Sequence, residues 1–171
     1  MRKAIAVAIL LVSFLLAGPV GAAPHGRHGH HPHRVRLAGT WVNPTAQMVV
    51  ATRLLGPDTY LNATGGTDWH GSLEGSTQYD LRGVFDSKTF VGGGALTETF
   101  TGRLASGAEG LLLLDETFHF ATDGSLEIVA HVETGTGAFK RARGEITFIG
   151  HSDANGVGSG TYAGTLRFAA Q

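Results

Sequence analysis

The chain of 171 residues contains no cysteine. It therefore forms no disulfide, and catalysis by a thiol and metal binding by thiolates are both excluded. The chain also has little net charge, with a formal value of −1 at pH 7, so we expect no electrostatic attraction to nucleic acid. A domain with these properties must be stabilised by apolar burial and hydrogen bonds alone.

A long apolar run occurs only at the N-terminus. Arg2 and Lys3 precede the apolar run Ala4–Leu16, and small residues follow it up to Ala22. This order is typical of a secretion signal, and the run is too short to cross a hydrocarbon layer of roughly 30 Å as a helix. We predict a signal peptide over residues 1–22 and a secreted or periplasmic protein with no membrane span after cleavage. The alternative is an uncleaved membrane anchor.

A histidine-rich segment, residues 23–38, follows the predicted cleavage site. Its composition lacks the apolar residues needed for a core, which predicts disorder. Its histidines predict weak, incidental binding of transition metals and no dedicated metal site. Pro24 has no amide hydrogen, so a tight copper site at the new amino terminus is excluded. The histidines are His25, His28, His30, His31 and His33.

No segment shows a convincing helical face, whereas glycine is abundant. The chain has 26 glycines, about twice the usual share of roughly 7%, scattered between segments in which apolar and polar residues alternate. Alternation with period two predicts β-strands, and short links favour antiparallel neighbours. The predicted strands are Gln47–Leu54, Trp69–Leu73, Gln78–Phe85, Leu96–Leu104, Leu111–Phe120, Leu126–Glu133, Glu145–Ile149 and Tyr162–Phe168.

Eight antiparallel strands commonly close into a barrel, because closure removes exposed edges. The fold prediction is therefore an all-β domain over residues 39–171, built as an eight-stranded antiparallel barrel. Glycines within strands, such as Gly71 and Gly83, suit the sharp coiling of a narrow barrel. A two-sheet sandwich has the same local pattern and is the structural alternative.

Two glutamates share the phase of apolar residues and are the candidate catalytic groups. Glu98 falls on the face of Leu96 and Phe100, and Glu116 falls on the apolar face of its own strand. Pairing Leu104 with Leu112 sets Glu116 across from Phe100 and diagonal to Glu98, within reach of long side chains. Two carboxyl groups in an apolar lumen repel, so one stays protonated and the pair can act as acid and base.

Other interpretations of this pair stay open at this point. Water at the barrel mouth, or an ion pair with Arg82 or Arg103, would make the acids ordinary structural groups. A bulge between Leu104 and Gly110 would shift the phase and expose Glu116.

Aromatic side chains supply the candidate ligand-binding residues. Tyr79 and Tyr162 share phase with apolar neighbours, so each can offer a phenolic hydroxyl inside the lumen, or pack with that hydroxyl at a rim. Trp69 and Phe100 are expected in the core or the lumen. His119 and His131 fall out of phase and are expected to face outward, and we predict no metal site in the domain.

Residues 135–144 read Gly-Thr-Gly-Ala-Phe-Lys-Arg-Ala-Arg-Gly. This segment resembles the Gly-Thr-Gly-x-Phe-x-x-Ala-x-Gly signature of plant dirigent proteins, and allene oxide cyclases share a related turn. The order of the other glycine and aromatic motifs is similar to small bacterial members of the same superfamily whose function is uncharacterised. The resemblance covers roughly residues 45–168. No family catalytic residue falls on a matching position, so none is carried over.

The resemblance implies an eight-stranded barrel with an apolar cavity, a cofactor-free activity and a homo-oligomer, commonly a trimer. Its plant members cyclise an oxylipin epoxide or direct the coupling of phenolic radicals. Three functions follow for this chain: a cyclase or isomerase, a non-catalytic carrier of a small hydrophobic molecule, or a structural barrel with a filled lumen. The sequence does not decide whether the protein is an enzyme.

Overall fold

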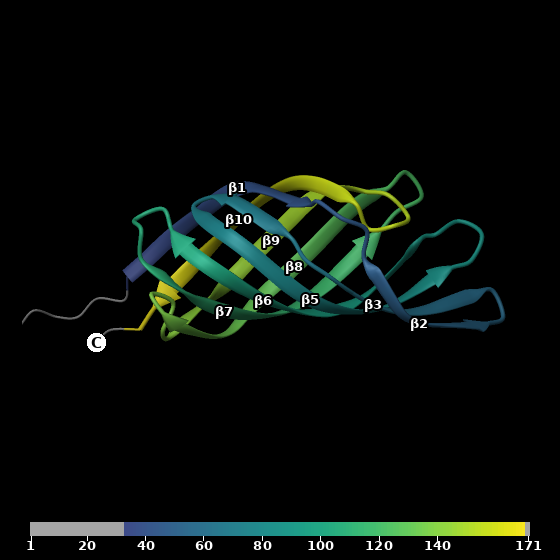
Figure 1. Cartoon of the computed structure of the whole chain (residues 1–171), viewed down its shortest axis with the longest axis horizontal. Coiled ribbons are helices and arrows are strands. Elements are labelled where there is room, and N and C mark those ends of the chain that lie inside the picture. The colour runs from purple at the N-terminus through teal and green to yellow at the C-terminus, as the bar shows by residue number, and fades with distance from the viewer. Residues whose placement is uncertain (1–32, 170–171) are drawn as a thin grey trace, which may run out of the picture.

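The computed structural model describes residues 33–169, which form a sheet of ten strands (Figure 1). This range contains no helix, and so none that could cross a membrane. The strands are β1 (His33–Asn43), β2 (Met48–Leu55), β3 (Asp58–Gly65), β4 (Asp68–Gly71), β5 (Leu73–Asp86), β6 (Gly92–Leu104), β7 (Glu109–Phe120), β8 (Ser125–Gly137), β9 (Ala142–Ser152) and β10 (Gly158–Phe168).

All paired strands are antiparallel, and the pairing of β5 with β6 closes the sheet into a barrel. The strands β3 and β4 pair with the same edge of β5 one after the other, so together they serve as one barrel strand. With β3 and β4 counted as one strand, and with β2 left out because it pairs only with β3, eight strands surround the lumen. The predicted eight-stranded antiparallel barrel is confirmed, and the sandwich alternative is wrong.

Two strands were not anticipated from the sequence. β1 begins at His33, within the segment 23–38 that was expected to be disordered, so the folded domain starts before residue 39. The strand forms because it pairs with β10 along its whole length and buries Leu37 and Trp41. β3 is rich in polar residues and is held by pairing with β2 and β5. The predicted signal peptide, residues 1–22, and the rest of the histidine-rich segment lie outside the described residues.

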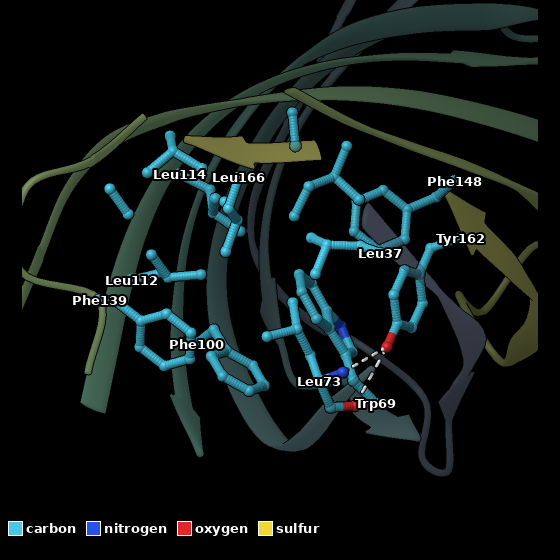
Figure 2. Close-up of a cluster of buried hydrophobic side chains, with 14 of the residues drawn as sticks. Leu37, Trp69, Leu73, Phe100, Leu112, Leu114, Phe139, Phe148, Tyr162 and Leu166 are labelled. Atoms are coloured by element: carbon cyan, nitrogen blue, oxygen red, sulfur yellow. Dashed lines mark hydrogen bonds between the residues drawn. The ribbon is translucent and has the colours of Figure 1, made fainter. Parts of the chain in front are cut away.

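One end of the barrel is filled by side chains, and residues 135–144 contribute to it. The turn between β8 and β9 carries Phe139, which is fully buried and meets Phe100 edge to face at 5.9 Å between ring centroids (Figure 2). Gly137 enters this turn with a φ of +57°, a conformation that favours glycine. The glycine motif therefore specifies the closed end of the barrel.

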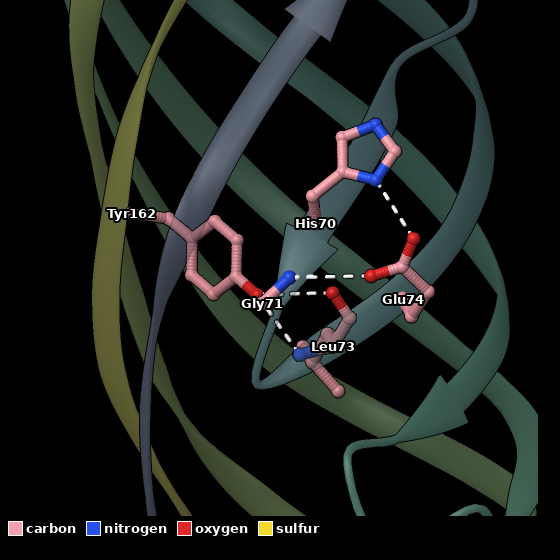
Figure 3. A network of polar contacts seen from close by, with 5 residues as sticks. All are labelled: His70, Gly71, Leu73, Glu74 and Tyr162. Atoms are coloured by element: carbon pink, nitrogen blue, oxygen red, sulfur yellow. Dashed lines mark hydrogen bonds and ion pairs between the residues drawn. The ribbon is translucent and has the colours of Figure 1, made fainter. Parts of the chain in front are cut away.

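Trp69 lies between the filled end and the rest of the lumen. Its ring stacks on Phe100 with centroids 5.0 Å apart and packs against Phe148 at 4.9 Å and Tyr162 at 5.5 Å. The Tyr162 hydroxyl accepts a hydrogen bond from the Leu73 amide at 2.9 Å and donates one to the Leu73 carbonyl at 3.1 Å (Figures 2 and 3). The hydroxyl contacts join β10 to β5, and the Tyr162 ring lies over Gly39 of β1 between them.

The opposite end of the barrel is open. There the β2–β3 hairpin extends past the other strands, at the right of Figure 1. Every residue of β2 is exposed, including five large apolar side chains, because β2 pairs only with β3 among the described strands. The five are Met48, Val49, Val50, Leu54 and Leu55.

Candidate functional site

A cavity of about 260 Å³ occupies the open end of the barrel. Its mouth is formed by the β2–β3 hairpin and by the turns that follow β5 and β9, and its walls are mostly apolar. The apolar wall residues include Leu61, Leu81, Phe85, Leu96, Phe118, Leu126, Ile128 and Phe148. The lumen is thus filled by side chains at one end and hollow at the other.

Both predicted carboxyl groups line this cavity. Glu98 is 4% exposed and Glu116 is 2% exposed. Glu98 pairs with Leu114 and Glu116 pairs with Leu96 across β6 and β7, so the two glutamates lie diagonally on the inner face. The bulge that would have exposed Glu116 does not occur.

The predicted register of this hairpin was wrong, although the diagonal relation survives. Leu112 pairs with Phe100 and not with Leu104. The cause is a tight turn closed by the hydrogen bond from the Leu104 amide to the Ala108 carbonyl at 2.9 Å. The resulting shift of four residues is even, so every side chain keeps its face.

Glu98 is supported by a short interruption between β3 and β4. The Thr67 amide donates to the Thr77 hydroxyl at 3.0 Å, and the Asn43 side-chain amide donates to the Gly66 carbonyl and the Thr67 hydroxyl at 3.1 and 3.2 Å. The hydroxyls of Thr67 and Thr77 are in turn hydrogen-bonding neighbours of Glu98. Thr67 of the interruption and Thr77 of β5 are thus held in place beside Glu98.

The two glutamates differ in their hydrogen bonding and so in their tendency to ionise. Burial raises the pKa of Glu98, opposed by hydrogen bonds from Glu116, Thr77 and Thr67. Burial raises the pKa of Glu116 well above 4.5, and the neighbouring charge of Glu98 raises it further. Both Glu116 oxygens are buried and accept no hydrogen bond from any donor group. A proton on Glu116 that is donated to Glu98 accounts for all of these facts.

Of the predicted ligand-binding residues, Trp69 and Tyr79 line the cavity. Burial, and secondarily the charge of Glu98, raises the pKa of Tyr79 to about 12. The Tyr79 ring lies over Gly65 of the adjacent strand, where a Cβ would fall 2.3 Å from the hydroxyl oxygen. Glycine at this position therefore lets the tyrosine lie against the wall.

Phe100 and Tyr162 do not line the cavity. Both belong to the packed core that fills the other end of the barrel. The Tyr162 hydroxyl is occupied by the backbone of Leu73, so its role here is structural. Phe100 lies on the same inner face as Glu98. It is two residues farther along β6, toward the closed end of the barrel.

The alternatives that involved other charged residues are not realised within residues 33–169. Arg82 and Arg103 are exposed on the outer face, and neither forms an ion pair with a glutamate of the cavity. The ion pairs in this range join His70 to Glu74 at 2.8 Å (Figure 3) and His131 to Glu145 at 3.7 Å. His119 and His131 face outward as predicted.

Sequence reasoning missed several residues of the site, above all Trp41. This residue lines the cavity, and its indole nitrogen and that of Trp69 are buried without a hydrogen-bond partner. The sequence could have predicted this strand, because inward-facing residues recur at every second position, at Leu37, Gly39, Trp41 and Asn43. Thr67 and Thr77 carried no such signal, because their role depends on the interruption between β3 and β4.

Comparisons with known proteins bear on the fold alone. The chain matches no protein-family model and no curated protein. Its structure is similar to that of a protein of unknown function from the DUF3224 family of Shewanella oneidensis MR-1, with a TM-score of 0.61 and 18% sequence identity. The match covers 80% of this chain and 99% of that one. At this identity the likeness shows a shared barrel fold.

Proposed function

We propose that this protein binds a small, mostly apolar molecule in the open end of the barrel, with a polar end of that molecule against Glu98 and Glu116. The observation that supports this proposal most strongly is the burial of Glu98 and Glu116 side by side. A carboxyl group whose oxygens lack donors is costly to bury, by about 1–3 kcal/mol, and a ligand that contacts the pair removes that cost. The two indole N–H groups of Trp41 and Trp69 also lack acceptors.

The size of the cavity limits the ligand. A volume of about 260 Å³ lies just below the range of roughly 300–1,000 Å³ that is usual for drug-sized molecules. The ligand is therefore small, with a single ring or a short chain. The resemblance of residues 135–144 to dirigent proteins and allene oxide cyclases favours a small hydrophobic ligand and a chemistry that needs no cofactor, and the signal-like residues 1–22 favour action outside the cytoplasm.

A binding experiment tests the proposal. Native mass spectrometry of the protein from the cells that produce it should show an added mass that is lost on denaturation. Leu126→Trp fills the cavity from β8 and should abolish that mass. Glu127→Trp places the same ring on the outer face of the same strand and should leave it unchanged. A wild-type protein without added mass, or an added mass that Leu126→Trp retains, contradicts the proposal.

Proton-transfer catalysis is the second candidate function, favoured by the unequal protonation of the pair. Glu98, whose ionised form is favoured over that of Glu116 by the threonine hydroxyls, is the base that removes a proton from carbon next to a carbonyl group. Glu116, protonated, is the acid that donates a hydrogen bond to the carbonyl oxygen, and Glu98 returns its proton at the γ carbon. The result is an isomerised enone with no net change in atoms or electrons.

This activity has a direct test. The protein should convert a β,γ-unsaturated cyclic ketone to its conjugated isomer, followed by ultraviolet absorbance. Glu98→Gln should lower the rate by about a hundredfold or more, as loss of a general base does. Equal rates in wild type and in Glu98→Gln would exclude the catalytic function and leave the binding function standing.

A further inference from the structure

Apart from Tyr79, the ionisable side chains that line the cavity are all carboxylic acids. They are four carboxyl groups, with no lysine, arginine or histidine among the lining residues, namely Asp86, Glu98, Glu116 and Asp153. Two of them stand at the mouth and two lie inside. Because the walls are apolar and exclude water, the negative potential of the inner pair is weakly screened.

The two aspartates at the mouth are fixed by their turns. Asp86 accepts hydrogen bonds from the amides of Lys88 and Thr89 at 3.0 and 2.8 Å. Asp153 accepts from the amides of Asn155 and Val157 at 2.8 and 3.0 Å. In each case the contacts go to a single oxygen, Oδ1, so the turns hold an acidic group at the entrance on two sides.

The unpaired oxygens of Glu116 are a second, independent indication that a ligand binds beside this residue. Its side chain is 2% exposed, it lines the cavity, and neither oxygen receives a hydrogen bond from a donor group. With one proton between them, Glu116 and Glu98 carry one negative charge, and such a pair is satisfied best by N–H groups that carry positive charge, since charge-assisted hydrogen bonds are about twice as strong as neutral ones. No such group among the described residues reaches Glu116.

The walls around the inner acids are aromatic. Trp41, Trp69, Tyr79, Phe118 and Phe148 all contribute to the lining. The faces of aromatic rings attract cations, most strongly when the cation has lost its water. A cavity with acidic groups at its centre and rings in its walls matches an organic ammonium ion better than a neutral molecule or an anion.

We propose that the ligand of this cavity is a small organic amine, bound in its protonated form with the ammonium group against Glu116 and Glu98 and the carbon skeleton among the aromatic side chains. This inference rests on the proposed binding function and specifies its ligand class. It also sets the site apart from one that would take a fatty acid or another carboxylate, because the acidic lining repels anions.

Three probes with one carbon skeleton test the ligand class. Phenethylamine, phenethyl alcohol and hydrocinnamate carry a cationic, a neutral and an anionic end, and isothermal titration calorimetry on the full chain measures their affinities. The amine should bind about ten- to a hundredfold more tightly than the alcohol, since this is what a hydrogen-bonded charge contributes. Hydrocinnamate should not bind measurably, and Ca²⁺ should not compete with the amine.

Matched variants test whether the preference for the amine over the alcohol arises at Glu98 and Glu116. The double variant Glu98→Gln/Glu116→Gln leaves no charge on the pair and should bring the amine and the alcohol to similar affinities while the alcohol still binds, which shows that the cavity is intact. Glu127→Gln removes one charge from the exposed face of β8 and should change neither affinity. An amine preference that the double variant retains arises elsewhere on the protein and overturns the inference.

The possible results distinguish the proposed ligand class from the proposed binding function. If the alcohol or hydrocinnamate binds at least as tightly as the amine, or if Ca²⁺ displaces the amine, the ligand class is wrong and the binding function stands. If none of the three probes binds, the ligand class is wrong, and the binding function is decided separately by native mass spectrometry of the wild-type and Leu126→Trp proteins.

Discussion

Tyr79 on β5 is paired directly with Glu98 on β6, so the phenol and the carboxyl group are cross-strand neighbours in the cavity. This pairing couples the ionisation of the two side chains. It also links the wall of the cavity to the acidic pair, because Glu98 contacts Glu116. A substitution of one of these three side chains should therefore change the pKa of another.

The first prediction concerns the phenol of Tyr79. Its pKa is raised to about 12 by burial and then by Glu98, so Glu98→Gln should lower that pKa while leaving it above 10.0. Because the folded value exceeds the unfolded one, this tyrosine's contribution to stability is complete below pH 10.0 and is lost as pH rises through about 12. The ultraviolet absorbance difference between each protein and its Tyr79→Phe variant measures the titration. An identical midpoint in both backgrounds contradicts the coupling.

The second prediction concerns stability and Glu116. Its raised pKa means that the folded protein holds this proton more tightly than the unfolded chain does. The contribution is complete below 4.5 and is lost as pH rises through the higher folded value. In Glu116→Gln the amide donates to Glu98 at every pH, so the variant should be more stable than wild type by about 1–3 kcal/mol near pH 7.

Urea denaturation at several pH values measures this difference, which should vanish below pH 4.5. Glu127→Gln is the matched control on the outer face of β8 and should show no comparable gain. A Glu116→Gln variant that is less stable than wild type at neutral pH would show that the carboxyl group makes favourable contacts that the structure lacks.

The third prediction separates structural from functional tyrosines. Tyr162→Phe removes the hydroxyl that bridges the amide and carbonyl of Leu73, leaving buried backbone groups unpaired. We expect a loss of about 1–3 kcal/mol in the free energy of unfolding, measured by urea denaturation, with unchanged ligand affinity. Tyr79→Phe should show the converse, a small effect on stability and a changed affinity. An affinity loss in Tyr162→Phe would place that residue in the site.

The fourth prediction concerns the two ends of the barrel. Phe139 is fully buried at the closed end, so Phe139→Ala should cost about 3–5 kcal/mol. Phe90 stands at the mouth, 54% exposed and with a φ of +59°. Phe90→Ala should therefore leave the unfolding free energy within about 1 kcal/mol of wild type. Thermal or urea unfolding checks both, and equal losses would contradict the division into a filled and an open end.

Much of the barrel could be predicted from the sequence because strands with one buried face carry a strong alternation. Glu98 and Glu116 were assigned to the lumen from phase alone, and an error of four residues in register did not matter, since phase repeats every two residues. β3 escaped prediction because its polar residues owe their strand conformation to their neighbours. β1 escaped because a histidine-rich segment runs without a break into its first residues.

The division of the lumen could not be predicted in the same way. Trp69, Phe100 and Tyr162 share the phase of inward residues, but phase does not say how far along the barrel axis a side chain lies. That depth is set by strand tilt and by plugs such as Phe139, which are properties of the closed barrel. The support of Glu98 by Thr67 and Thr77 likewise exists only once β3, β4 and β5 are assembled.

The most direct test is to measure the ionisation of the Glu98–Glu116 pair in the folded protein. Carbon-13 NMR of the glutamate side-chain carboxyl carbons, assigned with Glu98→Gln and Glu116→Gln, follows each group as pH is changed. We predict that Glu116 titrates well above 4.5 and that its resonance moves when a ligand enters the cavity. Titration of both groups near 4.5, with no response to any ligand, would contradict this prediction.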